Sequence, residues 1–183
     1  RNTLANAIFD DEIENFRVVT GHIGGSFGMK NFYAETIMTI WASRKLKRPV
    51  KWENDREESL LSDYHGRDKV ADLELALDAD GTFLGIRANI IANMGAYLSP
   101  LFVAHTLLSN GGIIGVYKTP TAYLKISAIH TNTGSTNPYR GSNRPDVAYY
   151  IERLIDVAAA EINIDRMELR RRNIIPEDAF PYQ

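Results

Sequence analysis

Two loops in the sequence combine glycine with a basic side chain, and each could bind an anion. The first is GHIGGSFGMK at residues 21–30, between a short β-branched run and an apolar segment with helical spacing. Gly24, Gly25 and Gly28 would let the backbone take positive φ and approach a ligand closely. A helix beginning just after Gly28 would also direct unpaired N–H groups toward a negative charge. A tight turn without a ligand would use the same residues, so both interpretations stay open.

The named nucleotide-binding motifs do not fit this first loop. A P-loop needs Gly, Lys and Ser or Thr in succession, but Met29 separates Gly28 from Lys30 and Asn31 follows. The GxGxxG fingerprint of dinucleotide-binding proteins is also absent. A binding module that holds a phosphorylated ligand on residues 24–30 in another way remains an alternative function.

The second loop, residues 134–145, contains the run NPYRGSNRP before a long helical pattern. Arg140 beside Gly141 could present its planar guanidinium to an oxyanion or a phosphate. An arginine that pairs with a surface carboxylate is the simpler alternative. Ser135 and Ser142 have no histidine nearby in the sequence, so a hydrolase triad is not supported.

Composition limits the classes of function. The 183 residues are 44% hydrophobic and 24% charged, which is ordinary for a globular protein of one domain or two small lobes. The net charge is −2, and the densest basic run, Arg170 to Arg172, is surrounded by acidic residues. We therefore expect that run to be a solvated helix face, and we expect no nucleic-acid partner. No apolar run approaches the roughly 18 residues of a membrane helix, so no membrane partner is expected.

Cysteine is absent, which excludes disulfides, thiolate metal ligands and a cysteine nucleophile within these residues. Its absence is compatible with a reducing compartment, and a cytoplasmic location is expected. The first residues have neither an initiator Met nor the layout of a signal peptide. Both ends are therefore expected to continue into a longer protein.

Alternating and helical spacings predict the elements that position the two loops. A hairpin is expected over residues 69–92, around the turn DADG at 78–81. Asp165 is expected to cap the last helix, and the mixture of strand pairs and separate helices predicts an α+β fold. Other strands are expected at 16–19, 50–53 and 123–131, and helices at 34–46 with one buried face, 57–62, 101–108, 147–158 and 165–172.

Taken together, the loops closely resemble those of the molybdenum hydroxylases, the family of xanthine dehydrogenase, aldehyde oxidase and the large chain of aerobic carbon monoxide dehydrogenase. That family has the pattern GGGFGxK, and this chain has GGSFGMK at 24–30. A long run, RGSNRPDVAYYIERLIDVAAAEINIDRMELRRRN at 140–173, matches the family's second loop and the helices that follow it. NMGAYLS at 93–99 is also similar.

The resemblance implies that residues 1–183 form a single part of a molybdopterin-binding region, with loops 21–30 and 134–145 beside the cofactor. Ser26 stands where the family has a third glycine, which argues against a contact that needs positive φ there. The implied cofactor-binding residues are Gly25, Ser26, Phe27, Gly28 and Arg140, and the implied substrate-facing residues are Ser142 and Asn143.

The family's metal takes its sulfur ligands from the pterin, so no residue here is expected to bind metal directly. The four histidines show no metal-ligand spacing. Gly141 stands where copper-containing carbon monoxide dehydrogenases have a cysteine, which disfavours carbon monoxide chemistry. Asn31 and Ser142 replace an acidic residue and a phenylalanine of the xanthine-type enzymes. An aldehyde or a small N-heterocycle is therefore favoured as the substrate.

The implied reaction hydroxylates a C–H bond of that substrate with oxygen derived from water. The implied cofactor is molybdopterin, in its cytosine dinucleotide form, with iron–sulfur clusters and FAD on partner domains or subunits. The implied partners are the rest of the large subunit and a small-molecule substrate. No residue matches the family's catalytic glutamate, so these 183 residues alone are expected to be inactive, and their exposed interfaces could drive self-association. A non-catalytic homologue is the other alternative.

Overall fold

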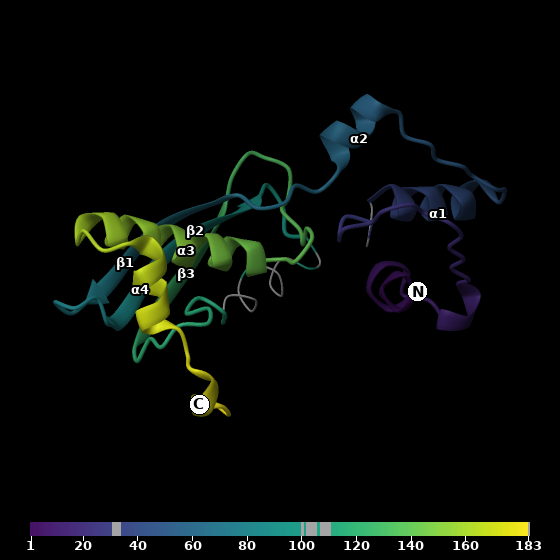
Figure 1. The fold of residues 1–183 in the computed structure, drawn as a ribbon. Coiled ribbons are helices and arrows are strands. Elements are labelled where there is room, and N and C mark those ends of the chain that lie inside the picture. Colours follow the sequence, from purple (N-terminus) through teal and green to yellow (C-terminus); the bar gives the residue numbers. More distant parts are fainter. Residues whose placement is uncertain (31–33, 100, 102–105, 107–110, 183) are drawn as a thin grey trace. The chain divides into compact units, whose positions relative to one another are not determined.

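The computed structural model describes residues 1–30, 34–99, 101, 106 and 111–182. The chain divides into two compact units, Arg1–Asp63 and Tyr64–Gln183, and each is described by itself. Figure 1 shows the helices of the first unit and the sheet and two helices of the second. None of the helices in the described ranges combines the length and apolar character that a bilayer-spanning segment requires.

The first unit contains helices and no strand in the part that the structure describes. Its elements are η1 (Thr3–Phe9), η2 (Ile13–Asn15), α1 (Ala34–Leu46) and α2 (Arg56–Ser62). The start of α2 is set by a capping box, because the Asp55 carboxylate accepts from Glu58 N at 2.8 Å. The Glu58 carboxylate in turn accepts from Asp55 N at 3.2 Å. The predicted helix at 57–62 is thus confirmed.

Three predictions for this unit are wrong. Residues 16–19 and 50–53 form no strand, since a short β-branched run adopts β-structure only where a neighbouring strand completes its hydrogen bonds. The predicted buried face of α1 is not buried either, and Met38, Trp41 and Leu46 are all exposed. Helical spacing predicts a helix with an apolar face, but only a packing partner buries that face.

The second unit is organised by the predicted hairpin, which is confirmed. β1 (Lys69–Leu77) pairs antiparallel with β2 (Phe83–Gly95), and the Asp78 carboxylate accepts from Asp80 N at 3.1 Å and Thr82 N at 2.9 Å in the turn between them. β3 (Ala122–His130) confirms the next predicted strand and pairs parallel with β2. The sheet order is therefore β1-β2-β3. The predicted helix at 101–108 lies almost entirely outside the described residues.

Helices α3 (Arg144–Glu161) and α4 (Arg166–Asn173) confirm the last two predicted helices. α3 lies across the sheet (Figure 1). α4 packs against α3, and its last residues bond to the turn between β1 and β2. Asp165 caps α4 as predicted, because its carboxylate accepts from Met167 N and Glu168 N. The core between sheet and helices is apolar and consists of Phe83, Ile86, Ala88, Ile113, Tyr117, Val147, Ile151, Ile155, Ala158, Ala159 and Leu169. Strands and helices around this one core make the predicted α+β fold.

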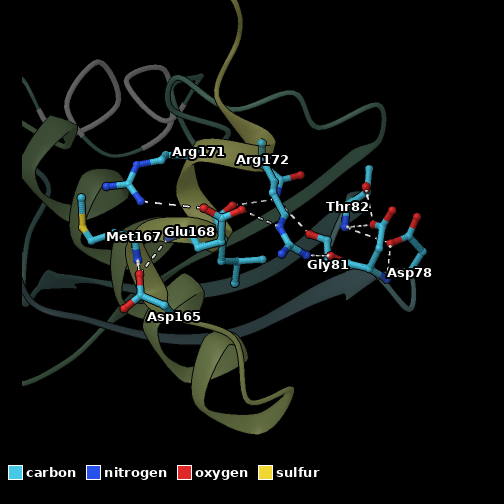
Figure 2. A network of polar contacts seen from close by, with 11 residues as sticks. Asp78, Gly81, Thr82, Asp165, Met167, Glu168, Arg171 and Arg172 are labelled. Atoms are coloured by element: carbon cyan, nitrogen blue, oxygen red, sulfur yellow. Dashed lines mark hydrogen bonds and ion pairs between the residues drawn. The ribbon is translucent and has the colours of Figure 1, made fainter.

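The basic run of α4, Arg170 to Arg172, binds both α3 and the turn between β1 and β2. Only part of this run is therefore a solvated helix face. The Arg170 side chain is 17% exposed and pairs with Glu152 and Asp156 of α3 at 2.8 Å each. Its hydrogen bond holds the pKa of the Asp156 carboxyl below its usual range. Arg172 pairs with Glu168, as Figure 2 shows. Arg172 also donates to the Asp80 carbonyl. Arg171, 70% exposed, is the member that fits the expectation.

Candidate functional site

The glycine-rich loop, residues 21–30, is largely exposed and has three residues in the left-handed region. These are Gly24 (φ 68°), Phe27 (φ 52°) and Gly28 (φ 101°). Ser26 is not among them. A serine in place of the family's third glycine is therefore compatible with this backbone, because no positive φ is needed at that position.

The Phe27 ring lies against the backbone of the same loop. A Cβ atom at Gly25 would lie 2.5 Å from Phe27 Cε2, so a side chain there would displace the ring. Phe27 is nevertheless 52% exposed. Met29 N donates to Ser26 O at 2.9 Å, and Lys30 Nζ donates to the carbonyl of Ile23. Lys30 thus helps to close the loop on itself.

The helix predicted at 34–46 after this loop is confirmed as α1 (Ala34–Leu46). Residues 27–30 form turns, and the described part of α1 begins at Ala34, with 31–33 outside the described residues. The amides next to Gly28 are therefore those of a turn in the described structure. An anion at Gly28 would meet the backbone of this turn.

The second loop, residues 134–145, is anchored on its first side by buried polar residues. Ser135, Thr136 and Asn137 are each at most 3% exposed. His65 N donates to Ser135 O at 3.1 Å, and Asn137 N donates to His65 O at 2.9 Å, which joins the loop to the segment before β1. The loop is therefore held by the body of the second unit.

The tip of the second loop is a tight turn over Tyr139, Arg140, Gly141 and Ser142. Ser142 N donates to Tyr139 O at 2.9 Å, and Gly141 (φ 83°) and Ser142 (φ 56°) are both left-handed. A Cβ atom at Gly141 would lie 3.0 Å from the Pro145 ring, so both the conformation and the space favour glycine. Arg140 is exposed and Ser142 is partly buried, so both lie where a ligand could contact them.

Asn143, expected on the substrate-facing wall, has its side chain turned into the protein. It is 0% exposed. Its Nδ2 donates to Thr106 O at 3.1 Å, and its Oδ1 accepts from Lys69 Nζ. These contacts give Asn143 a supporting position behind Ser142 in the described structure.

Sequence reasoning did not identify the side chains that support this loop. Arg67 and Lys69, at alternate positions before and at the start of β1, both reach it, and Asp146 in the first turn of α3 pairs with both. The carbonyl of Asn93, in the NMGAYLS segment, accepts from Thr136 Oγ1 of the loop at 2.7 Å. Two basic residues two positions apart beside a predicted strand were the only signal, and such spacing is common on exposed strands.

Two buried polar atoms of the second loop have no hydrogen-bond partner within the described part of the chain. They are Ser135 Oγ and Asn137 Nδ2. Buried polar groups are normally satisfied by protein, water or ligand. Within the part of the chain that the structure describes, no group of three or more His, Cys, Asp or Glu side chains could hold a metal ion.

Comparison with known proteins identifies the family of both loops. The molybdopterin cofactor-binding domain matches residues 1–174, which include the first unit and most of the second. The chain is 37% identical, over 92% of its length, to the 6-hydroxypseudooxynicotine dehydrogenase complex subunit gamma of Paenarthrobacter nicotinovorans. It spans about a fifth of the length of the curated relatives it matches, 21% in this case.

Solved structures agree with this assignment. Carbon monoxide dehydrogenase from Oligotropha carboxidovorans matches 99% of this chain and 23% of its own, with a TM-score of 0.90 and 30% identity. Quinoline 2-oxidoreductase from Pseudomonas putida 86 matches 88% of this chain and 21% of its own, with a TM-score of 0.81 and 34% identity. The fold of this chain thus has counterparts in both of these solved enzymes.

Proposed function

The chain belongs to the molybdopterin cofactor-binding domain family of the molybdenum hydroxylases, and we propose that its two loops form part of the cofactor site of an oxidoreductase that hydroxylates a small organic substrate with oxygen from water. The observation that carries this proposal is the second loop, whose exposed Arg140–Gly141 tip stands on buried flanks. An exposed arginine on an anchored turn is suited to bind an anionic or oxo-bearing group. When bound, the cofactor supplies the redox centre for oxidation of the substrate C–H bond.

Each loop has a distinct part in holding the cofactor. The guanidinium of Arg140 would donate hydrogen bonds to it, and the backbone of the turn near Gly28 would approach it closely. The Phe27 ring covers one side and excludes water. Gly25 gives the Phe27 ring room against the backbone, and Ser26 closes the turn through its carbonyl. Ser135 Oγ has no hydrogen-bond partner among the residues that the structure describes, which supports a polar ligand or a water on the second loop.

The substrate proposed is an N-heterocycle, with an aldehyde as the alternative. Quinoline, named for one structural relative, is an N-heterocycle. Ser142 is small and partly buried beside the Arg140 tip, so it leaves room for a flat ring. Gly141 lacks the thiol that the copper-containing enzymes place at this position, which argues against carbon monoxide as the substrate.

The cofactor is proposed to be the cytosine dinucleotide form of molybdopterin. Electrons are proposed to leave through iron–sulfur clusters and FAD on partner domains or subunits. The designation of one relative as the gamma subunit of a complex supports such partners. The general base is proposed to lie in another part of the large subunit, so the 183 residues alone are expected to lack turnover.

The proposal is tested on the natively purified full-length protein, by its molybdenum content and its turnover of quinoline-type substrates. Arg140→Ala is expected to lower turnover or molybdenum content by about 10-fold to 100-fold, in the range for groups that orient a metal site. The matched control is Arg171→Ala, which removes an exposed arginine from α4. A native protein without molybdenum would identify a non-catalytic homologue, and an unchanged Arg140→Ala variant would remove Arg140 from the site.

A further inference from the structure

Three charged side chains meet beneath the second loop, and the proposed function does not yet use them. Asp146 accepts Lys69 Nζ on Oδ2 at 2.9 Å, while Arg67 Nε lies 3.3 Å from Oδ1. Lys69 and Asp146 are 5% and 10% exposed, and Arg67 is 26% exposed. One carboxylate in the first turn of α3 thus joins two cations from the start of β1.

The two cations bind the two ends of the loop tip. Arg67 Nη2 donates to the carbonyls of Tyr139 at 2.9 Å and Arg140 at 2.5 Å, and its guanidinium lies 5.7 Å from the centre of the Tyr139 ring. Lys69 Nζ donates to Asn143 Oδ1 on the other side. Both ends of the Arg140–Ser142 turn are therefore tied to the same carboxylate through one side chain each.

Stability alone is a weak reason for such an arrangement. Burial of charged groups costs desolvation energy, and well-packed apolar residues often serve a fold as well or better. A planar guanidinium that bonds two successive carbonyls, by contrast, defines their orientation. The bonds of Arg67 end on the backbone of Arg140, the residue proposed to contact the cofactor.

We infer that Arg67, held by Asp146, is a positioning residue that sets the orientation of the Arg140–Ser142 turn toward the bound cofactor, with Lys69 fixing the far end of the turn through Asn143. This inference rests on the proposed function. Arg67 itself does not touch the reacting atoms. It acts through the two carbonyls, as outer groups orient the inner contacts of many metal sites.

The test uses Arg67→Gln in the full-length protein, with Arg87→Gln as the matched control. Arg87 is an exposed arginine on β2 that pairs with Glu74 across the hairpin and lies away from the second loop in sequence. The first readout is amide hydrogen exchange of residues 138–144, which does not depend on turnover. The others are kcat, KM, molybdenum content and the thermal midpoint.

The expected result is faster exchange confined to 138–144 and a kcat lowered by about 10-fold to 100-fold, with KM, molybdenum content and thermal midpoint near those of Arg87→Gln. Arg67→Lys, which keeps the charge but replaces the planar fork, should recover part of kcat. Normal kcat despite faster exchange would overturn the inference. Exchange that rises equally in β1 and α3, with a lower midpoint, would reduce Arg67 to a structural role.

Two further outcomes keep the inference separate from the proposed function. If Arg67→Gln does not accumulate as folded protein, Arg67→Lys alone decides, and it must show faster exchange at 138–144 for the inference to stand. If the unmodified protein contains no molybdenum, the proposed function fails, and the exchange of 138–144 still shows whether Arg67 orders the turn.

Discussion

The two loops belong to one family pattern, yet the chain supports them very differently. The second loop stands on a sheet and two helices around a core of fully buried side chains such as Ile151 and Ile155. The glycine-rich loop belongs to a unit in which only Leu4 and Ala5 are buried among the described residues. Its loop is closed mainly by its own bonds, such as Lys30 to the Ile23 carbonyl.

This difference shows that a loop can match the family's sequence pattern whether or not the rest of its own unit holds it in place. The second loop has its orientation built in by contacts within its own unit. The first loop lies among exposed apolar side chains, including Val18, Val19 and Ile23. These side chains stabilise the fold only when they are buried against another surface. We therefore expect the first unit to open more readily than the second.

The largest expected effect is on the core of the second unit. Ile155→Ala should lower the free energy of unfolding by about 2–5 kcal/mol, because it leaves a cavity at a fully buried site. Met38→Ala, on the exposed face of α1, should change it by no more than about 0.5 kcal/mol. Urea unfolding followed by circular dichroism measures both values.

Tryptophan fluorescence sharpens the same comparison, because Trp41 and Trp52 are the only tryptophans and both lie in the first unit. In Ile155→Ala the midpoint by circular dichroism should fall while the fluorescence midpoint stays near its original value. Coincident transitions in both variants would mean that the two units unfold as one. The contrast between them would then be lost.

A smaller effect is expected when the two loops are compared directly. Gly141→Ala places a side chain at φ 83° and close to the Pro145 ring, so it should cost more than about 1 kcal/mol. Ser26→Gly should cost less than about 1 kcal/mol, since it only adds freedom to the unfolded chain. Thermal unfolding of both variants is the measurement, and a larger loss for Ser26→Gly would contradict the described geometry of the first loop.

The smallest effect appears only at high pH, in the second unit. Burial, and then the hydrogen bond to Glu152, raise the pKa of Tyr117 to about 12. The pKa of Tyr117 in the folded protein is above the unfolded value of 10.0. The contribution of protonated Tyr117 to the free energy of unfolding is therefore complete below pH 10 and is lost as pH rises to about 12. Tyr117→Phe should therefore flatten the fall in stability over that range. An identical pH profile for the variant and the original protein would disprove the role of Tyr117.

Local patterns predicted most of the second unit. The DADG turn defined the hairpin, and Asp165 marked the start of α4, because turn and cap chemistry depends on a few neighbouring residues. The parallel pairing of β3 with β2 could not be predicted in this way, since it depends on the path of a long connection. Residues 16–19 show the same limit, because their β-branched run found no strand to pair with.

The sequence by itself determined the family and the positions of both loops, because glycines, Arg140 and the long run after it are read residue by residue. Only the tertiary structure decided which side chains of the second loop are exposed and which are buried against the rest of its unit. Asn143 sits three positions from Arg140, yet the buried Lys69 and the Thr106 carbonyl turn its amide inward. Arg67 became a partner of the loop because folding brings it to the carbonyls of Tyr139 and Arg140, which are 72 and 73 positions away in the chain.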